Sequence, residues 1–118
     1  MTTTRDTVET TRHVTDHLPE YKAALEEQRR FRLAQLDELA EAQAHASPAA
    51  DDVDDQVNEI LRSGAQTALV EAEDALERLC AETFGICERC MSRISHERLE
   101  ILPMSRYCMR CQHALEVR

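Results

Sequence analysis

Two Cys-x2-Cys pairs near the C-terminal end constrain this chain more than any other feature. Cys87 and Cys90 form the first pair, Cys108 and Cys111 form the second, and 17 residues lie between the pairs. Two residues between cysteines allow one turn to present both sulfur atoms to one ion, and the intervening loop is long enough to bring the second pair back. The spacing predicts one tetrahedral Zn²⁺ site. Because four thiolates leave no position for water or substrate, the zinc is expected to be structural.

The alternatives for these cysteines are two disulfides or unliganded thiols in a core. No apolar run in the sequence approaches the length of a membrane span, and the N-terminal residues lack the apolar region of a signal peptide. A cytoplasmic location, where thiols stay reduced, is therefore expected, and it favours thiolates on zinc over disulfides. His96 and His113 flank the cysteines but are not expected to be ligands, because the cysteines already complete the site.

The chain before the cysteines has the composition of long helices. Only 3% of the 118 residues are aromatic, and Ala, Leu, Glu, Arg and Gln dominate instead. Residues 1–15 are rich in Thr without apolar periodicity, so a flexible tail is expected there. Residues 16–84 are predicted to form an antiparallel two-helix coiled-coil hairpin with its tip near residues 47–56. Residues 85–118 are predicted to form the zinc finger and a closing helix, so the fold class is mostly α.

The hairpin prediction depends on two apolar stripes at helical spacing. The first helix is predicted from Asp16 to about Ala46 and the second from about Asp52 to Glu82, with the Ser-Pro connection between them. The first stripe comprises Leu18, Tyr21, Leu25, Leu36, Leu39 and Gln43. The second comprises Val53, Val57, Ile60, Leu61, Ala65, Ala68, Ala72, Leu76 and Leu79. Gly64 interrupts the second helix and is expected to mark a bend or a close approach of the helices.

Several smaller features give local expectations. Gly85 is expected to end the second helix as its C′ residue, and Cys80 is expected to be a small core residue on that helix. Ser95 is predicted to cap a short helix that runs through Glu100, and the closing helix is predicted from residue 108 to 117. The apolar residues expected beneath the zinc are Ile94, Leu99 and Ile101. The histidines expected to face solvent are His13, His17 and His45.

The charge distribution argues against a nucleic-acid partner. The net charge is −9, and residues 51–84 carry ten acids but only Arg62 and Arg78 as bases. Residues 85–118 are formally +2, and four thiolates on zinc would bring this segment close to neutral. Nucleic-acid binding needs a positive field to neutralise phosphates. The balance therefore favours a protein partner, and sequence-specific DNA binding is not expected.

The layout resembles the DksA/TraR family of bacterial zinc-finger transcription regulators. The resemblance is densest at residues 84–90, at Ile94, Arg98-Leu99-Glu100 and Pro103, and at residues 108–111. It implies a monomeric cytoplasmic regulator that binds RNA polymerase. In this family the coiled coil enters the secondary channel, and acidic residues at its tip approach the active-site region and alter initiation, often together with the nucleotide ppGpp.

The resemblance also implies which residues act. The tip motif of the family is Asp-x-x-Asp-x-Ala, and Asp51 and Asp54 match its two acids, with Asp52 and Asp55 as an alternative register. Gln56 stands where the family has Ala. The alternative is that these acids only cap a solvated helix start. The possible polymerase-docking residues are Arg89, Arg93 and Arg98, and ordinary surface charge, including a contact of Arg98 with Glu97 or Glu100, is the alternative.

Two further departures from the family bear on regulation. Members that respond to ppGpp carry basic residues where this chain has Gly64, Glu71 and Gln112. Since a polyanionic nucleotide needs cations, a weak or absent ppGpp response is expected. Met91 follows the first cysteine pair where the family usually has Gly, and a positive φ there would be unfavourable for Met.

No catalytic constellation is present outside the cysteines, so an enzyme is not expected. The leading prediction is a polymerase-binding regulator with the tip acids as effectors. A regulator that senses oxidation through its zinc thiolates is one alternative. A non-catalytic coiled-coil scaffold is the other.

Overall fold

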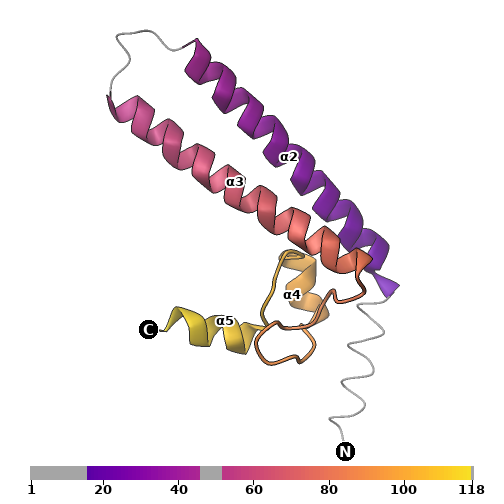
Figure 1. Ribbon diagram of the computed structural model, residues 1–118. Helices are drawn as coiled ribbons and strands as arrows, with labels where there is room; N and C mark the ends of the chain where they lie inside the picture. The colour runs from indigo at the N-terminus through magenta and orange to yellow at the C-terminus, as the bar shows by residue number, and fades with distance from the viewer. Residues whose placement is uncertain (1–15, 46–51, 118) are drawn as a thin grey trace, which may run out of the picture.

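The computed structural model describes residues 16–45 and 52–117, and these are helical apart from the finger loops. The helices are α2 (Leu18–Ala44), α3 (Asp52–Cys80), α4 (His96–Ile101) and α5 (Met109–Glu116). Within the described residues the only β structure is an isolated bridge between Ile86 and Arg93. The long helices α2 and α3 lie side by side and antiparallel, and the small C-terminal module packs at one end of the pair (Figure 1). The predicted fold class is confirmed.

Helix α2 begins and ends close to the predicted positions. His17 is its N-cap residue, Pro19 lies in the first turn where no backbone N–H is needed, and Glu20 faces the positive end of the helix dipole. Only Tyr21 and Leu25 are buried on this helix. The predicted apolar stripe is therefore buried only over the first two turns. Farther along the same face, polar side chains such as Gln28 and Arg32 are half-buried.

Helix α3 contacts α2 through small side chains. Ala65, Ala72 and Ala75 are fully buried, and they are spaced by seven and three residues along one face. The predicted stripe was wrong in its N-terminal half, because Val53, Val57, Ile60 and Leu61 are all exposed. At 3.6 residues per turn, the residues 53, 57 and 60 lie roughly 100° around the axis from the line of Ala65 and Ala72. Ala75, however, lies at nearly the same angle as Val57, and the exposed Leu61 lies close to the line of Ala65 and Ala72, so the face of α3 that is buried changes along the helix.

Two other features expected of α3 are not present: a close approach at Gly64 and the burial of Cys80. A Cβ placed on Gly64 would meet no atom within 4 Å, so this glycine does not mark a close approach of the two helices. Cys80 is exposed at the end of α3, although Leu79 beside it packs against the core.

Helix α3 ends by a Schellman motif that the sequence did not reveal. Glu82 has a φ of 61°, its N–H bonds to the Leu79 carbonyl oxygen, and the Thr83 N–H bonds to the Arg78 carbonyl oxygen at 3.0 Å. The C′ residue is therefore Glu82, three residues before the predicted Gly85. Gly85 also has a positive φ, of 81°, but its carbonyl oxygen accepts from the Ile94 N–H at 2.8 Å and closes the finger loop.

The hydrophobic core lies where the hairpin meets the C-terminal module. Its buried members come from both, and they are Tyr21, Leu25, Ala75, Phe84, Cys87, Ile94, Leu99 and Cys111. The Tyr21 and Phe84 rings have centroids 5.3 Å apart, and such aromatic pairs stabilise beyond their buried area. Ile101, expected in this core, is instead exposed at the end of α4. One core thus joins the base of the hairpin to the module.

Candidate metal centre

The first cysteine pair lies on a tight turn after Gly85. The Met91 N–H donates to the Cys87 carbonyl oxygen at 2.9 Å, and the Cys87 N–H donates to the Ser92 carbonyl oxygen at 2.8 Å. This turn presents both sulfur atoms on one side. It also requires Met91 to adopt a φ of 62°, the left-handed conformation expected at this position of the knuckle.

The second pair is carried by the start of α5. Cys108 is the N-cap residue of that helix and Cys111 lies in its first turn, and the Gln112 N–H donates to the Cys108 carbonyl oxygen at 2.9 Å. Residues three apart lie on the same face of a helix start. The two sulfur atoms therefore point toward the first pair across the module.

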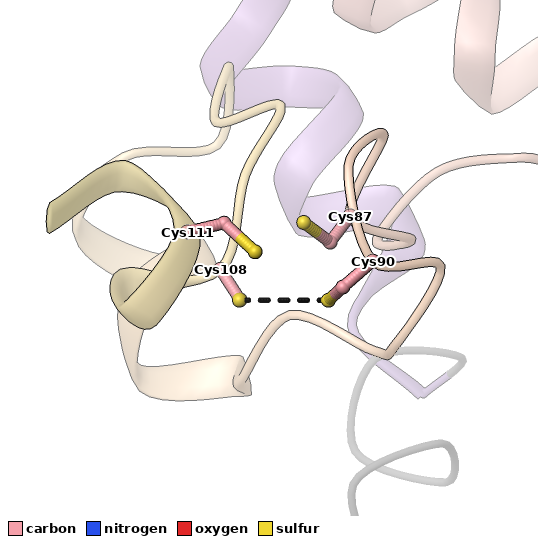
Figure 2. A group of neighbouring side chains, drawn as sticks. All are labelled: Cys87, Cys90, Cys108 and Cys111. Atoms are coloured by element: carbon pink, nitrogen blue, oxygen red, sulfur yellow. Dashed lines mark hydrogen bonds between the residues drawn. The ribbon is translucent and has the colours of Figure 1, made fainter. Parts of the chain in front are cut away.

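The four cysteine sulfur atoms converge as a zinc ion requires (Figure 2). They all lie within 4.8 Å of one another, and the Cys90 and Cys108 sulfur atoms are 3.8 Å apart. Two ligands of a tetrahedral ion with Zn–S bonds of about 2.3 Å lie about 3.8 Å apart. All five cysteines are free thiols, so the disulfide alternative does not hold. Among the described residues no other group of His, Cys, Asp or Glu side chains is placed to hold a metal, and His96 and His113 are not part of this one.

The environments of the four sulfur atoms are unequal. Cys87 and Cys111 are buried, whereas Cys90 is exposed. The Ser92 hydroxyl donates to the Cys90 sulfur at 2.7 Å, and this hydrogen bond is the main cause that lowers the pKa of Cys90 to about 6. Burial, together with the neighbouring thiols, raises the pKa of Cys111 to about 12. A bound zinc would replace the protons on these sulfurs and stabilise the thiolates.

Comparison with known families agrees with this geometry. Residues 82–117 match the model of the prokaryotic dksA/traR C4-type zinc finger. The C-terminal module is a DksA/TraR zinc finger. The family description and the clustering of Cys87, Cys90, Cys108 and Cys111 both assign one structural zinc to these ligands.

The similarity extends beyond the DksA/TraR finger at the level of fold. The structure of transcription factor DksA2 from Pseudomonas aeruginosa superposes with a TM-score of 0.73 at 23% sequence identity, covering 86% of this chain and 84% of that one. An uncharacterised protein from Aquifex aeolicus is 44% identical over 48 residues, which is 41% of this chain. The match spans 33% of that relative's length.

Two arginines fasten the DksA/TraR finger to α3 through contacts that the sequence did not predict. Arg106 forms an ion pair with Asp74, and Arg78 donates to the carbonyl oxygens of Met104 and Ser105 at 3.3 and 3.5 Å. Burial lowers the pKa of Arg78, although Glu88 partly opposes this. These partners are 26 to 32 residues apart in sequence, so no local pattern could have identified them.

An aromatic cluster fastens the finger to α2. The Tyr21 hydroxyl hydrogen-bonds to His96 Nδ1, and the His96 ring stacks on His17 with centroids 4.5 Å apart. His17 Nδ1 also contacts Glu20 Oε2 at 2.9 Å. His17 was expected to face solvent, and this was wrong because α4 packs against the first turn of α2. The finger therefore contacts both arms of the hairpin.

The predicted tip and docking residues lie at different ends of the molecule. Asp54, Asp55 and Gln56 are exposed in the first turns of α3, at the end of the hairpin away from the finger (Figure 1). Asp51 lies outside the described residues, so part of the predicted tip motif does too. Residues 1–15, which include His13, also lie outside them.

The three arginines proposed for docking differ in their surroundings. Arg89 and Arg93 are exposed on the finger. Arg98 instead donates from Nε to the Tyr107 carbonyl oxygen at 3.0 Å, and the contacts considered for it with Glu97 and Glu100 are not the ones it makes. Arg98 thus has a role inside the finger that the other two lack.

An open groove of about 940 Å³ separates α3 from α5. Glu71 and Gln112, two of the three positions compared with ppGpp-responsive proteins, both line it. Gly64 does not. The groove also contains Arg98 and Arg106, but each of them already has a partner, Tyr107 and Asp74 respectively. Its wall therefore offers an anion few uncommitted cationic groups.

Proposed function

We propose that this protein is a non-catalytic, cytoplasmic transcription regulator that binds RNA polymerase and inserts its hairpin into the secondary channel. One arrangement carries the proposal. A narrow rod of two helices, about 40 Å long at 1.5 Å per residue, begins at a DksA/TraR finger and ends, at the other end of the pair, with the acidic first turn of α3 (Figure 1). The likeness to the fold of transcription factor DksA2 supports it.

The acids at the free end are the proposed effectors. Asp54 is exposed there, and Asp51 precedes the helix by one residue. Carboxylates on a slim rod can reach arginine or lysine side chains, backbone amides or Mg²⁺ deep in a channel. Gln56, exposed two residues after Asp54, is longer than the Ala of the family motif and is proposed to weaken or alter the contact.

The finger is proposed to supply docking contacts through Arg89 and Arg93. Arg98 is a weaker candidate for docking because its guanidinium already donates a hydrogen bond to the Tyr107 carbonyl oxygen within the finger. The groove lined by Glu71 and Gln112 is consistent with a weak or absent response to ppGpp. The protein is proposed to act as a monomer without sequence-specific DNA binding.

The double variant Asp51→Asn/Asp54→Asn tests the tip mechanism. Binding to core RNA polymerase in a pull-down should persist, while the effect on transcription in vitro should disappear. The variant Asp52→Asn/Asp55→Asn is the matched control, since it removes the same charge in the alternative register. Normal regulation by both variants would refute the role of the acids, and loss of regulation in the second alone would identify the other register.

A second candidate function is sensing of oxidants by the zinc thiolates. The exposed sulfur of Cys90 favours it, since an accessible metal thiolate is the point where peroxide would attack. Titration of the zinc-loaded protein with hydrogen peroxide should release zinc as thiols are lost. Retention of the metal at oxidant levels that consume free Cys80 would argue against this function.

A further inference from the structure

A strip of aliphatic side chains lies bare on the distal half of α3. Val53, Val57 and Ile60 are spaced by four and three residues, so they form one line along the helix. Their exposed fractions are 58%, 49% and 70%. We call these three residues the aliphatic strip. Solitary exposed aliphatic residues are ordinary, whereas contiguous exposed apolar side chains are a feature of contact surfaces.

The strip is free of charge although the surrounding segment is strongly acidic. Asp54, Asp55 and Glu59 are exposed in the same two turns, but at 100° per residue each lies roughly 100° or more around the axis from the line of the strip. The line continues to Gly64, where an added Cβ would meet nothing within 4 Å. The described parts of the chain thus leave this face uncovered while the acids point elsewhere.

The size and charge of this face indicate what kind of surface covers it. A stable protein–protein interface buries about 800 Å² on each partner, and three aliphatic side chains offer far less. A second copy would also bring two acidic segments together, which is unfavourable. The strip fits instead as one part of a larger contact, with an apolar partner surface bordered by basic side chains that face the neighbouring acids.

We propose that the aliphatic strip packs against an apolar, basic-bordered face of RNA polymerase inside the channel and supplies binding affinity, while the tip acids supply the regulatory effect. This inference rests on the proposed function. It assigns affinity and effect to different residues of the same helix start, since Val53 lies beside Asp54, and Val57 and Ile60 follow Asp54 by three and six residues.

The variant Val57→Gln/Ile60→Gln tests the affinity of the strip. Glutamine keeps the helix propensity and removes the aliphatic surface, so helicity and zinc content should be unchanged. Binding to core RNA polymerase should weaken by roughly tenfold, as expected when part of a desolvated contact is lost. Leu33→Gln is the matched control, because Leu33 is a similarly exposed aliphatic residue on α2, and its affinity should be unchanged.

A photocrosslinking amino acid at position 60 identifies what covers the strip. An adduct with a polymerase subunit supports the proposal. An adduct with a second copy, or with residues 1–15 of the same chain, overturns it. If the wild type binds polymerase and the glutamine variant binds equally well, the strip proposal fails while the proposed function stands. If the wild type does not bind polymerase at all, the proposed function itself fails.

Discussion

At the scale of single residues, Met91 stores strain in the first zinc knuckle. Its φ of 62° is costly for a side chain with a Cβ, by about 1 kcal/mol or slightly more. Its side chain is 72% exposed, so it contributes little packing in return. The turn is retained because the hydrogen bond from the Met91 N–H to the Cys87 carbonyl oxygen and the ligand Cys90 directly before Met91 define the backbone path.

Met91→Gly is therefore expected to stabilise the zinc-loaded protein by about 1 kcal/mol, because glycine adopts positive φ without a steric penalty. Denaturant unfolding in the presence of zinc measures it. Met91→Ala is the control, since it removes the side chain but keeps the Cβ, and it should give no comparable gain. Equal stabilisation by both would show that the exposed side chain, not the backbone, is the cause.

The unequal thiols predict how zinc affinity depends on pH. Because zinc binds thiolates, any ligand that is still protonated without metal must release its proton on binding. The pKa of Cys111 is raised to about 12 and that of Cys90 is lowered to about 6. Between pH 6 and 8 Cys111 therefore loses a proton when zinc binds, and Cys90 is increasingly ionised beforehand.

Zinc affinity should thus rise with pH over this window, with at least one proton released per ion. Competition with a chelator at pH 6, 7 and 8, together with calorimetry in buffers of different ionisation enthalpy, measures both quantities. Ser92→Ala removes the hydroxyl that donates to Cys90, so it should increase the number of protons released near pH 7. An affinity independent of pH would contradict the assignment of thiol ligands.

At the scale of elements, α3 is weakened by a glycine that no contact within the described residues requires. Gly64 lies in the interior of the helix, does not have a positive φ, and has open space where its Cβ would be. Gly64→Ala is expected to stabilise the hairpin by up to about 1 kcal/mol. Thermal unfolding followed by helical circular dichroism measures the effect. Gln66→Ala, two residues away and exposed, should change stability much less, and an equal gain would point to a different cause.

The elements were largely predictable because their signals are local. The cysteine spacing, Pro19 at the start of α2 and the Ser95 cap of α4, whose hydroxyl accepts from the Arg98 N–H at 3.3 Å, each act over a few residues. The burial pattern was less predictable. Val53 and Ile60 have the spacing of a core stripe, but the arms meet through Ala65 and Ala72, and the choice between two apolar lines on one helix depends on the facing helix.

The contacts that join the elements could not be predicted. The pairs Asp74–Arg106 and Tyr21–His96 are separated by 32 and 75 residues. A charged or aromatic residue on a helix surface looks the same in sequence whether or not a distant loop reaches it. The metal ligands were identified because zinc restricts residue type and spacing, whereas an ion pair restricts only the sign of the charge.

At the scale of the whole molecule, zinc removal should affect more than the finger. Cys87 and Cys111 belong to the same buried core as Tyr21 and Leu25 of α2. Chelation, or Cys90→Ser as a genetic equivalent, is expected to unfold the finger, since small zinc modules depend on the metal for folding. It should also increase amide hydrogen exchange at the base of both arms. Exchange confined to residues 85–117 would show that the hairpin base is stable alone.

The ion pair between Asp74 and Arg106 should contribute modestly to this junction. Both side chains are about two-fifths exposed, and such pairs contribute at most about 1 kcal/mol. A double-mutant cycle with Asp74→Asn and Arg106→Gln, read out by denaturant unfolding, should give a coupling energy below that value. A larger coupling would mean that the pair orients the finger rather than only fastening it.

The attachment of one finger to both arms has a consequence for the far end of the rod. Tyr21 on α2 and Asp74 on α3 each contact the finger, so a zinc ion that holds the finger folded would also constrain how the two helices lie relative to each other. Because the helices are long, a small change in their tilt at the finger would displace their far ends by a larger distance. If the acids at that end act as proposed, their position in the complex would depend on a metal site at the opposite end of the hairpin.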